Sequence, residues 1–271
     1  MLPEDIEQYY LRGRESARLA EQRGELERLR TQTILARELP PPPAVILDVG
    51  GAAGVYAFPL AEQGYKVHLI DPVELHLEQA RSASHAAAAG LASITRGEAG
   101  QLDFPSASAD AVLLLGPLYH LVEETDRQRA LREAWRVLKP GGVVVAAAIS
   151  RFASLIDGLS SDFFQDARFR AIVAADLSSG QHRNPGNHPE FFTTAYFHRP
   201  AELEAEVCAA GFGEARALAV EGPAWNAVRF REVWADPAQR KDLLEFLSRI
   251  ESEASIMGAS AHLVVVARRP G

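Results

Sequence analysis

The sequence is poor in cysteine: Cys208 is the only one among 271 residues. A single cysteine excludes an intramolecular disulfide and a cysteine-rich zinc site. The sequence also lacks an apolar run of about 18 residues, which a membrane-spanning helix requires. Its first residues lack the basic-then-apolar order of a secretory signal. We therefore expect a cytoplasmic protein that does not associate with membranes.

Basic residues are also in deficit, with 28 Lys and Arg against 36 Asp and Glu and a net charge of −8. Nucleic-acid binding depends on clustered cations, so we expect no nucleic-acid partner and a small-molecule ligand instead. The 47% of apolar residues and 24% of charged residues predict an ordinary globular chain with a sizeable core, not a disordered one.

Four consecutive prolines, residues 40–43, separate the first segment from the rest of the chain. Residues 4–38 are rich in strong helix formers and predict one or two helices. Proline cannot donate to a helical hydrogen-bond ladder, so the helices must end before this tract. We assign residues 1–43 to an N-terminal helical arm, which also offers a surface for pairing with a second copy of the chain.

From residue 44, short strand-forming segments alternate with helical segments. The expected strands span residues 45–47, 66–70, 93–96, 111–115, 143–149, 215–220 and 262–267, and the expected helices span 56–63, 73–89, 125–138, 200–210 and 237–256. This alternation predicts an α/β fold with a doubly wound, Rossmann-like parallel sheet. We expect residues 44–150 to form the ligand-binding core, 151–199 an inserted helical lid, and 200–271 the completion of the sheet.

A glycine-rich turn follows the first expected strand, in the run from Asp48 to Gly54. Glycines between a strand and a helix let a ligand approach the backbone closely. The spacing disfavours a nicotinamide dinucleotide, because Val49 occupies the place of the first glycine in G-x-G-x-x-G when Gly51 is the second. Asp48 would also repel a pyrophosphate, whereas it suits a nucleoside that carries a cationic sulfonium.

Acidic residues also end the next two strands. Asp71, 17 residues after Gly54, can accept hydrogen bonds from ribose hydroxyls, and Glu98 can accept one from an adenine amino group. The alternative is that each acid only caps a helix or turn. Three acids at three consecutive strand ends favour a nucleoside site.

These residues resemble those of class I S-adenosylmethionine-dependent methyltransferases, most closely the ubiquinone/menaquinone C-methylase-like branch. The resemblance rests on Val45–Gly54, Asp71, Gly97–Phe104, Ala109–Val112 and Arg132–Gly142. It implies seven strands with an antiparallel last strand, and S-adenosylmethionine as the cofactor. Two residues depart from the family pattern: Ala52 replaces its middle glycine, and Glu98 replaces an aspartate.

The resemblance implies that Gly50, Gly51 and Ala52 line the methionine part of the cofactor, Asp71 binds the ribose, and Glu98 with Ala99 binds the adenine. From the arm, Tyr10 and Arg14 share a helix face, from which Arg14 would reach the methionine carboxylate. The full set of expected cofactor-binding residues is Asp48, Gly50, Gly51, Ala52, Gly54, Asp71, Pro72, Glu98, Ala99, Leu115, Tyr10 and Arg14.

The segment after the fourth strand overhangs the expected methyl position. In it, His120 is the candidate general base, because imidazole titrates near neutral pH. Tyr119 is a candidate to orient the substrate or to pack against the adenosyl group. The alternative for His120 is a helix-opening histidine bonded to backbone. Tyr196, Phe197, His198 and Trp225 are the expected substrate-binding residues. The alternative for the aromatic residues of the segment 191–197 is that they only anchor the lid. The lid histidines lack the spacing of a metal site, and we expect no metal.

Together these features predict an enzyme that transfers a methyl group from S-adenosylmethionine to a small organic acceptor. The alternation and the motifs do not decide whether oxygen, nitrogen or carbon is methylated. A module that binds S-adenosylmethionine or S-adenosylhomocysteine without catalysing transfer is the alternative. A nicotinamide oxidoreductase is a third, disfavoured by the glycine spacing.

Overall fold

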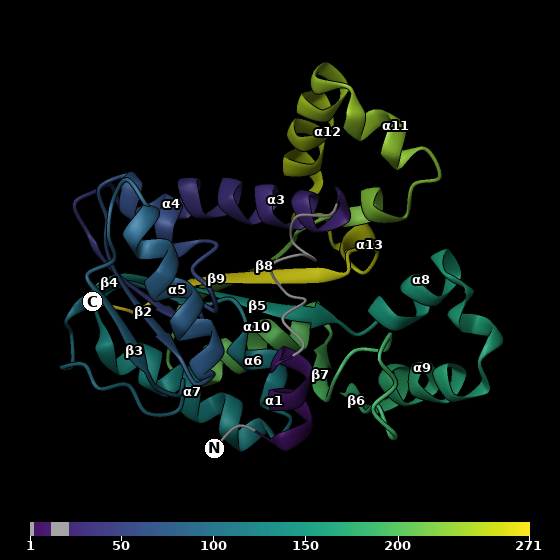
Figure 1. Cartoon of the computed structure of the whole chain (residues 1–271), viewed down its shortest axis with the longest axis horizontal. Coiled ribbons are helices and arrows are strands. Elements are labelled where there is room, and N and C mark those ends of the chain that lie inside the picture. The colour runs from purple at the N-terminus through teal and green to yellow at the C-terminus, as the bar shows by residue number, and fades with distance from the viewer. Residues whose placement is uncertain (1–2, 12–21) are drawn as a thin grey trace.

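The computed structural model describes residues 3–11 and 22–271 (Figure 1). Its helices are α1 (Glu4–Leu11), α3 (Gln22–Glu38), α4 (Ala57–Glu62), α5 (Glu74–Ala86), α6 (Pro117–His120), α7 (Glu124–Val137), α8 (Ala153–Ser160), α9 (Ala167–Ser179), α10 (Pro200–Ala209), α11 (Phe230–Ala235), α12 (Pro237–Ile250) and α13 (Ala254–Met257). Two short 3-10 helices are η1 (Asp162–Gln165) and η2 (Gly222–Asn226). Among the described residues, no helix has both the length and the apolar character that crossing a bilayer requires.

The strands are β1 (Val45–Val49), β2 (Lys66–Asp71), β3 (Ser93–Arg96), β4 (Ala109–Leu114), β5 (Leu138–Ser150), β6 (Gln181–His182), β7 (Ala195–His198), β8 (Gly213–Ala219) and β9 (His262–Arg268). The first five lie in the order β3-β2-β1-β4-β5 and are parallel. β9 runs antiparallel between β5 and β8. The predicted Rossmann-like sheet with an antiparallel last strand is therefore confirmed.

The lid adds two strands that the sequence analysis did not predict. β7 pairs in parallel with the last two residues of β5, Ile149 and Ser150, and β6 pairs with β7. This pairing is possible because β5 continues past its last partner in β4, Leu114, and so has a free edge. The described sheet therefore has nine strands, seven in the core and two from the lid.

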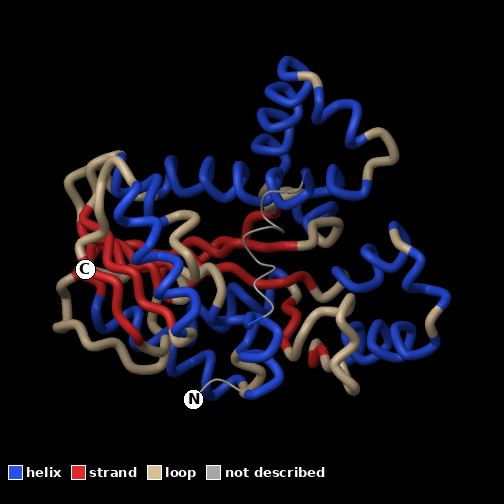
Figure 2. The backbone as a smooth tube through the Cα atoms, in the orientation of Figure 1, coloured by secondary structure: helices blue, strands red, loops and turns tan. Residues whose placement is uncertain are grey.

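Helices cover both faces of the sheet (Figures 1 and 2). On one face, apolar residues of α3, α4 and α5, such as Ile34, Leu60 and Leu77, pack on buried residues of β1 and β4. On the other, Leu131 of α7 and Leu203 of α10 pack on Val112 and neighbouring strand residues. β1 is buried on both faces, which explains why its sequence is an unbroken apolar run before Asp48.

Some predicted helix boundaries were wrong. The helix expected to reach residue 89 ends at Ala86, because Ala87 adopts an extended conformation. The helix expected over residues 237–256 is two helices, α12 and α13, which a turn separates after Ile250. The sequence analysis also did not predict α11, which with α12 projects away from the sheet (Figure 1).

A buried arginine fastens α3 to the C-terminal part of the chain. The Arg30 guanidinium is fully buried and donates to the Val220 carbonyl at 3.0 Å, the Ser248 hydroxyl at 2.5 Å and the Glu251 carboxylate at 2.5 Å. A buried charge is stable only when its hydrogen bonds are satisfied. Arg30 therefore makes the position of α3 depend on the end of β8 and on α12.

We predict that Arg30→Met lowers the free energy of unfolding by about 3–5 kcal/mol, because it leaves the Glu251 carboxylate buried with one cation fewer. Urea unfolding followed by circular dichroism measures the change. Arg81→Met is the control, since Arg81 pairs with Glu74 at the surface, and its effect should stay below about 1 kcal/mol. Equal effects of the two substitutions would contradict the role given to Arg30.

Candidate active site

The turn after β1 is shaped by contacts that leave no room for side chains. Gly50 has a φ of +71°, and its N–H donates to the Ile70 carbonyl at 2.7 Å. A Cβ atom there would lie 2.7 Å from the Pro117 ring, and one at Gly51 would lie 2.7 Å from the Asp48 carboxylate. Ala52 also has a positive φ, +47°, which costs an alanine about 1–2 kcal/mol. Ala52 thus adopts the left-handed backbone conformation that glycine, the residue of the family pattern at this position, adopts without strain.

Asp48 is the most unusual group in the site. Its side chain is 1% exposed, and neither carboxylate oxygen has a hydrogen-bond partner in the described part of the chain. Burial raises the pKa of Asp48 to about 7, with a further contribution from the nearby Asp71 carboxylate. A carboxyl group in this state is neutral in mildly acidic solution and becomes an anion when a cation lies beside it.

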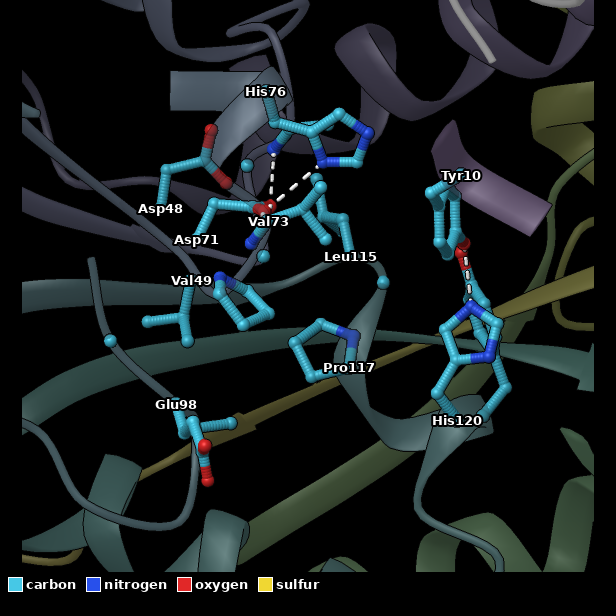
Figure 3. A pocket seen from close by; sticks show the side chains of 18 of the residues that line it. Tyr10, Asp48, Val49, Asp71, Val73, His76, Glu98, Leu115, Pro117 and His120 are labelled. Atoms are coloured by element: carbon cyan, nitrogen blue, oxygen red, sulfur yellow. Dashed lines mark hydrogen bonds and ion pairs between the residues drawn. The ribbon is translucent and has the colours of Figure 1, made fainter. Parts of the chain in front are cut away.

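Asp71 ends β2 and holds the turn in place. One of its oxygens accepts from Ala52 N at 2.9 Å, and the other accepts from Val73 N at 2.9 Å and lies 3.0 Å from His76 Nδ1 (Figure 3). A carboxylate has about four acceptor positions. These three contacts leave about one acceptor position for a ligand. Asp71 was expected to accept from both hydroxyls of a ribose, which would need two positions.

His120 receives a hydrogen bond from the N-terminal arm. Its Nδ1 lies 3.2 Å from the Thr194 carbonyl, which can only accept, so Nδ1 carries the proton. Nε2 lies 2.5 Å from the Tyr10 hydroxyl (Figure 3). In the neutral imidazole with this tautomer, Nε2 is the basic nitrogen and accepts from that hydroxyl.

The arm and the lid meet beside this histidine. The Thr193 hydroxyl donates to the Asp5 carbonyl of α1 at 3.3 Å. The Tyr9 ring packs edge-on against Phe192, whose ring stacks on His120. α1 and the lid together therefore set the position of His120.

One cavity gathers most of the predicted residues. Its lining includes the predicted catalytic residues Tyr119 and His120 and the predicted cofactor-binding residues Tyr10, Asp48, Gly50, Gly51, Ala52, Asp71, Pro72, Glu98, Ala99 and Leu115. Gly54 does not line the cavity; it is buried with a φ of +88° against Phe58, where it turns the chain into α4. Arg14 lies outside the described residues.

The four predicted substrate-binding residues do not line this cavity. Tyr196 stacks against the Arg127 guanidinium, Phe197 stacks on the His182 ring, His198 contacts Glu206 at 3.2 Å, and Trp225 donates to the Ala259 carbonyl. These contacts pack the lid and the chain after β8 onto the core. Tyr196, Phe197 and His198 belong to β7, whose pairing with β5 and β6 was not predicted.

His76 and Thr194, which contact Asp71 and His120, were not among the predicted residues, and Phe192, which stacks on His120, was expected only as one of the lid aromatics. His76 lies five residues after Asp71, in the first turn of α5, so its approach to the strand end was predictable from this short spacing. No local signal marks Phe192 and Thr194, because a long insertion brings them to His120.

Comparisons with known proteins agree with this geometry. A family of methyltransferase domains matches residues 47–146. The ubiquinone biosynthesis O-methyltransferase of Azorhizobium caulinodans is 32% identical over 172 residues, which cover 62% of this chain and 58% of that protein. The ubiquinone/menaquinone biosynthesis C-methyltransferase UbiE of Caulobacter vibrioides is 32% identical over 136 residues, covering 47% and 53%. The chain thus spans somewhat more than half the length of these relatives.

Residues 47–146 therefore form a class I S-adenosylmethionine-dependent methyltransferase domain. This confirms the resemblance described above, and S-adenosylmethionine is the cofactor of this domain. A crystal structure of an S-adenosylmethionine-dependent methyltransferase from Thermotoga maritima has the same fold, with a TM-score of 0.59, 18% identity and coverage of 98% of both chains. This likeness in fold extends over nearly the whole length of the chain.

We predict that Asp48→Asn gains stability relative to the wild-type domain as the pH rises from about 4 to about 7. In this range the unfolded wild-type chain loses the Asp48 proton while the folded one keeps it, so the wild type loses stability by up to about 1.4 kcal/mol per pH unit. Urea unfolding of both proteins at pH 4.5, 5.5, 6.5 and 8 measures the difference.

Asp236→Asn provides a control with the opposite sign. Backbone hydrogen bonds from Gln239 and Ala238 hold the pKa of Asp236 below its usual value, so the wild type should lose stability relative to this variant in acid. If the difference in unfolding free energy between the wild type and Asp48→Asn does not change with pH, the pKa of Asp48 is not raised in the folded protein.

Proposed function

We propose that this protein transfers a methyl group from S-adenosylmethionine to a hydroxyl group of a small aromatic molecule bound beneath α1. The observation that supports the proposal is a single cavity that joins the acids at the strand ends to the Tyr10–His120 pair. The first group suits the cofactor, and the second suits an acceptor that must lose a proton.

The strand-end residues fit the cofactor. When bound, S-adenosylmethionine supplies a methyl group on a positively charged sulfur. Asp48, buried without a hydrogen-bond partner among the described residues, would ionise beside the cationic amino-acid part. Asp71 keeps about one acceptor position for a ribose hydroxyl. Glu98 lines the same cavity after β3, where its carboxylate can accept from the adenine amino group.

His120 would take the acceptor's proton. A hydroxyl is a poor nucleophile until it is deprotonated, and a positioned base typically accelerates such a step by about 10²–10⁴. The Thr194 carbonyl holds the ring with Nε2 as the acceptor nitrogen. The Tyr10 hydroxyl now occupies the position in front of this nitrogen, and we infer that the acceptor hydroxyl takes that place when α1 moves aside.

The lining favours a flat acceptor. The rings of Tyr10, Tyr56 and Tyr119 contribute to the cavity, and aromatic rings prefer the faces and edges of other rings. The relatives are named for methylation in ubiquinone biosynthesis, which is consistent with a hydroxylated aromatic acceptor. Those names include both O- and C-methyltransferases, and the basic nitrogen of His120 favours oxygen.

We predict that Asp71→Asn weakens binding of S-adenosylhomocysteine more than tenfold, because a charge-assisted hydrogen bond contributes about 1.5–3 kcal/mol. Calorimetric titration measures the affinity, and thermal unfolding of the same sample shows whether the turn is intact. Glu74→Ala, three residues further along at an exposed position, should bind like the wild type. Unchanged affinity in a folded Asp71→Asn protein would remove the ribose assignment.

We predict that His120→Asn lowers kcat for methyl transfer by about 10²–10⁴ without changing the affinity for S-adenosylhomocysteine. Asparagine retains a donor for the Thr194 carbonyl but has no basic nitrogen. Tyr10→Phe should change kcat only a few-fold, since Tyr10 holds the acceptor's place. A screen of phenols and hydroxybenzoates with a labelled methyl donor identifies the acceptor for the assay.

The same screen separates catalysis from mere binding. If S-adenosylhomocysteine binds and no acceptor is methylated, the chain is a binding module with a methyltransferase fold. If an acceptor is methylated and His120→Asn is as fast as the wild type, the acceptor enters without needing a base, and carbon or nitrogen becomes the favoured target.

A further inference from the structure

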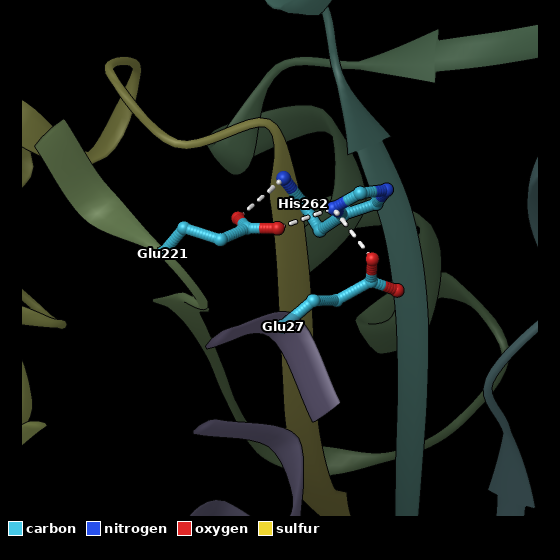
Figure 4. A group of neighbouring side chains, drawn as sticks. All are labelled: Glu27, Glu221 and His262. Atoms are coloured by element: carbon cyan, nitrogen blue, oxygen red, sulfur yellow. Dashed lines mark hydrogen bonds and ion pairs between the residues drawn. The ribbon is translucent and has the colours of Figure 1, made fainter. Parts of the chain in front are cut away.

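Three side chains from distant parts of the chain converge at the edge of the sheet that also carries the cavity. Glu27 comes from α3, Glu221 follows β8 by two residues, and His262 is the first residue of β9 (Figure 4). The Nδ1 atom of His262 lies 2.5 Å from one Glu221 oxygen and 3.7 Å from a Glu27 oxygen. One potential ligand atom from each residue lies within 4.8 Å of the others.

The buried member of this cluster is an acid. Glu221 is 3% exposed, and its second oxygen accepts from the Ser260 hydroxyl at 2.8 Å and from His262 N at 3.0 Å. The cluster thus places two carboxylates beside one imidazole nitrogen.

We propose that Glu27, Glu221 and His262 bind a divalent transition-metal ion such as Zn²⁺ or Mn²⁺. Ligand atoms at about 2.0–2.2 Å from such an ion lie up to about 4.4 Å apart, so small side-chain movements complete the site. The ion replaces the proton on Nδ1. One imidazole with two carboxylates suits these ions, whereas Ca²⁺ and Mg²⁺ require more oxygen ligands.

The position of the cluster links it to the cavity, because Glu27 belongs to both. Three protein ligands leave at least one coordination position open, as in catalytic zinc sites. An ion there would bind an oxygen of the acceptor and favour its ionised form. This role rests on the proposed function, whereas binding of the ion does not.

The test is a calorimetric titration of the full chain, freed of metal with a chelator, with Zn²⁺ and Mn²⁺. We expect one ion per chain, with Zn²⁺ bound more tightly than Mn²⁺ and both at least tenfold more tightly than Mg²⁺ or Ca²⁺. Glu27→Gln, on a partly exposed side chain, should weaken Zn²⁺ binding at least tenfold. Glu245→Gln, at the surface of α12, is the matched control and should bind Zn²⁺ like the wild type.

His262→Asn is a second test of the same site, for use if Glu27→Gln does not fold. Thermal unfolding shows whether each variant is folded. The proposed site is wrong if the wild type does not bind Zn²⁺ stoichiometrically, or if the folded variants bind Zn²⁺ as tightly as the wild type. His262 would then be an imidazolium held between two carboxylates. Methyl transfer measured on the same samples separates the two proposals: transfer without metal binding refutes the site alone, and metal binding without transfer refutes the proposed function alone.

Discussion

The pairing of β1 with β2 on one side and β4 on the other is the constraint on which the rest of the site depends. Parallel strands end at the same edge, so this pairing brings Asp48, Asp71 and the segment after Leu114 together although they are far apart in sequence. The close contact of Gly50 with the Pro117 ring exists only because β4 lies beside β1. A cavity at this edge follows from the topology of the sheet.

The site combines two kinds of buried polar group. Asp71 satisfies most of its acceptor positions with the turn that it supports, so its burial stabilises the local backbone. Asp48 has no such partner in the described structure, and its burial is unfavourable unless it is neutral or a cation lies beside it. Desolvation of the Asp48 carboxylate therefore costs free energy in the free protein, and a cation bound beside it would offset that cost.

The sequence predicted which strand-end residues line the cavity, but it did not predict where the lid residues pack. Asp71 and Glu98 were predictable because each stands at the carboxyl end of a predicted strand, Asp71 as the last residue of β2 and Glu98 two residues after β3. Tyr196, Phe197 and His198 were assigned to the substrate because the lid has no regular pattern that reveals β7. Once β7 pairs with the end of β5, their side chains belong to the packing of the sheet.

By itself, the sequence determined the order of the seven core strands, the glycine turn and the acids at the strand ends, since all of these depend on short-range periodicity and backbone preference. Only the tertiary structure decided which residues meet across long loops. Tyr10 reaches His120 over 110 residues, and Glu27 approaches His262 from the other end of the chain. Such contacts are selected by the packing of whole elements, which no local pattern encodes.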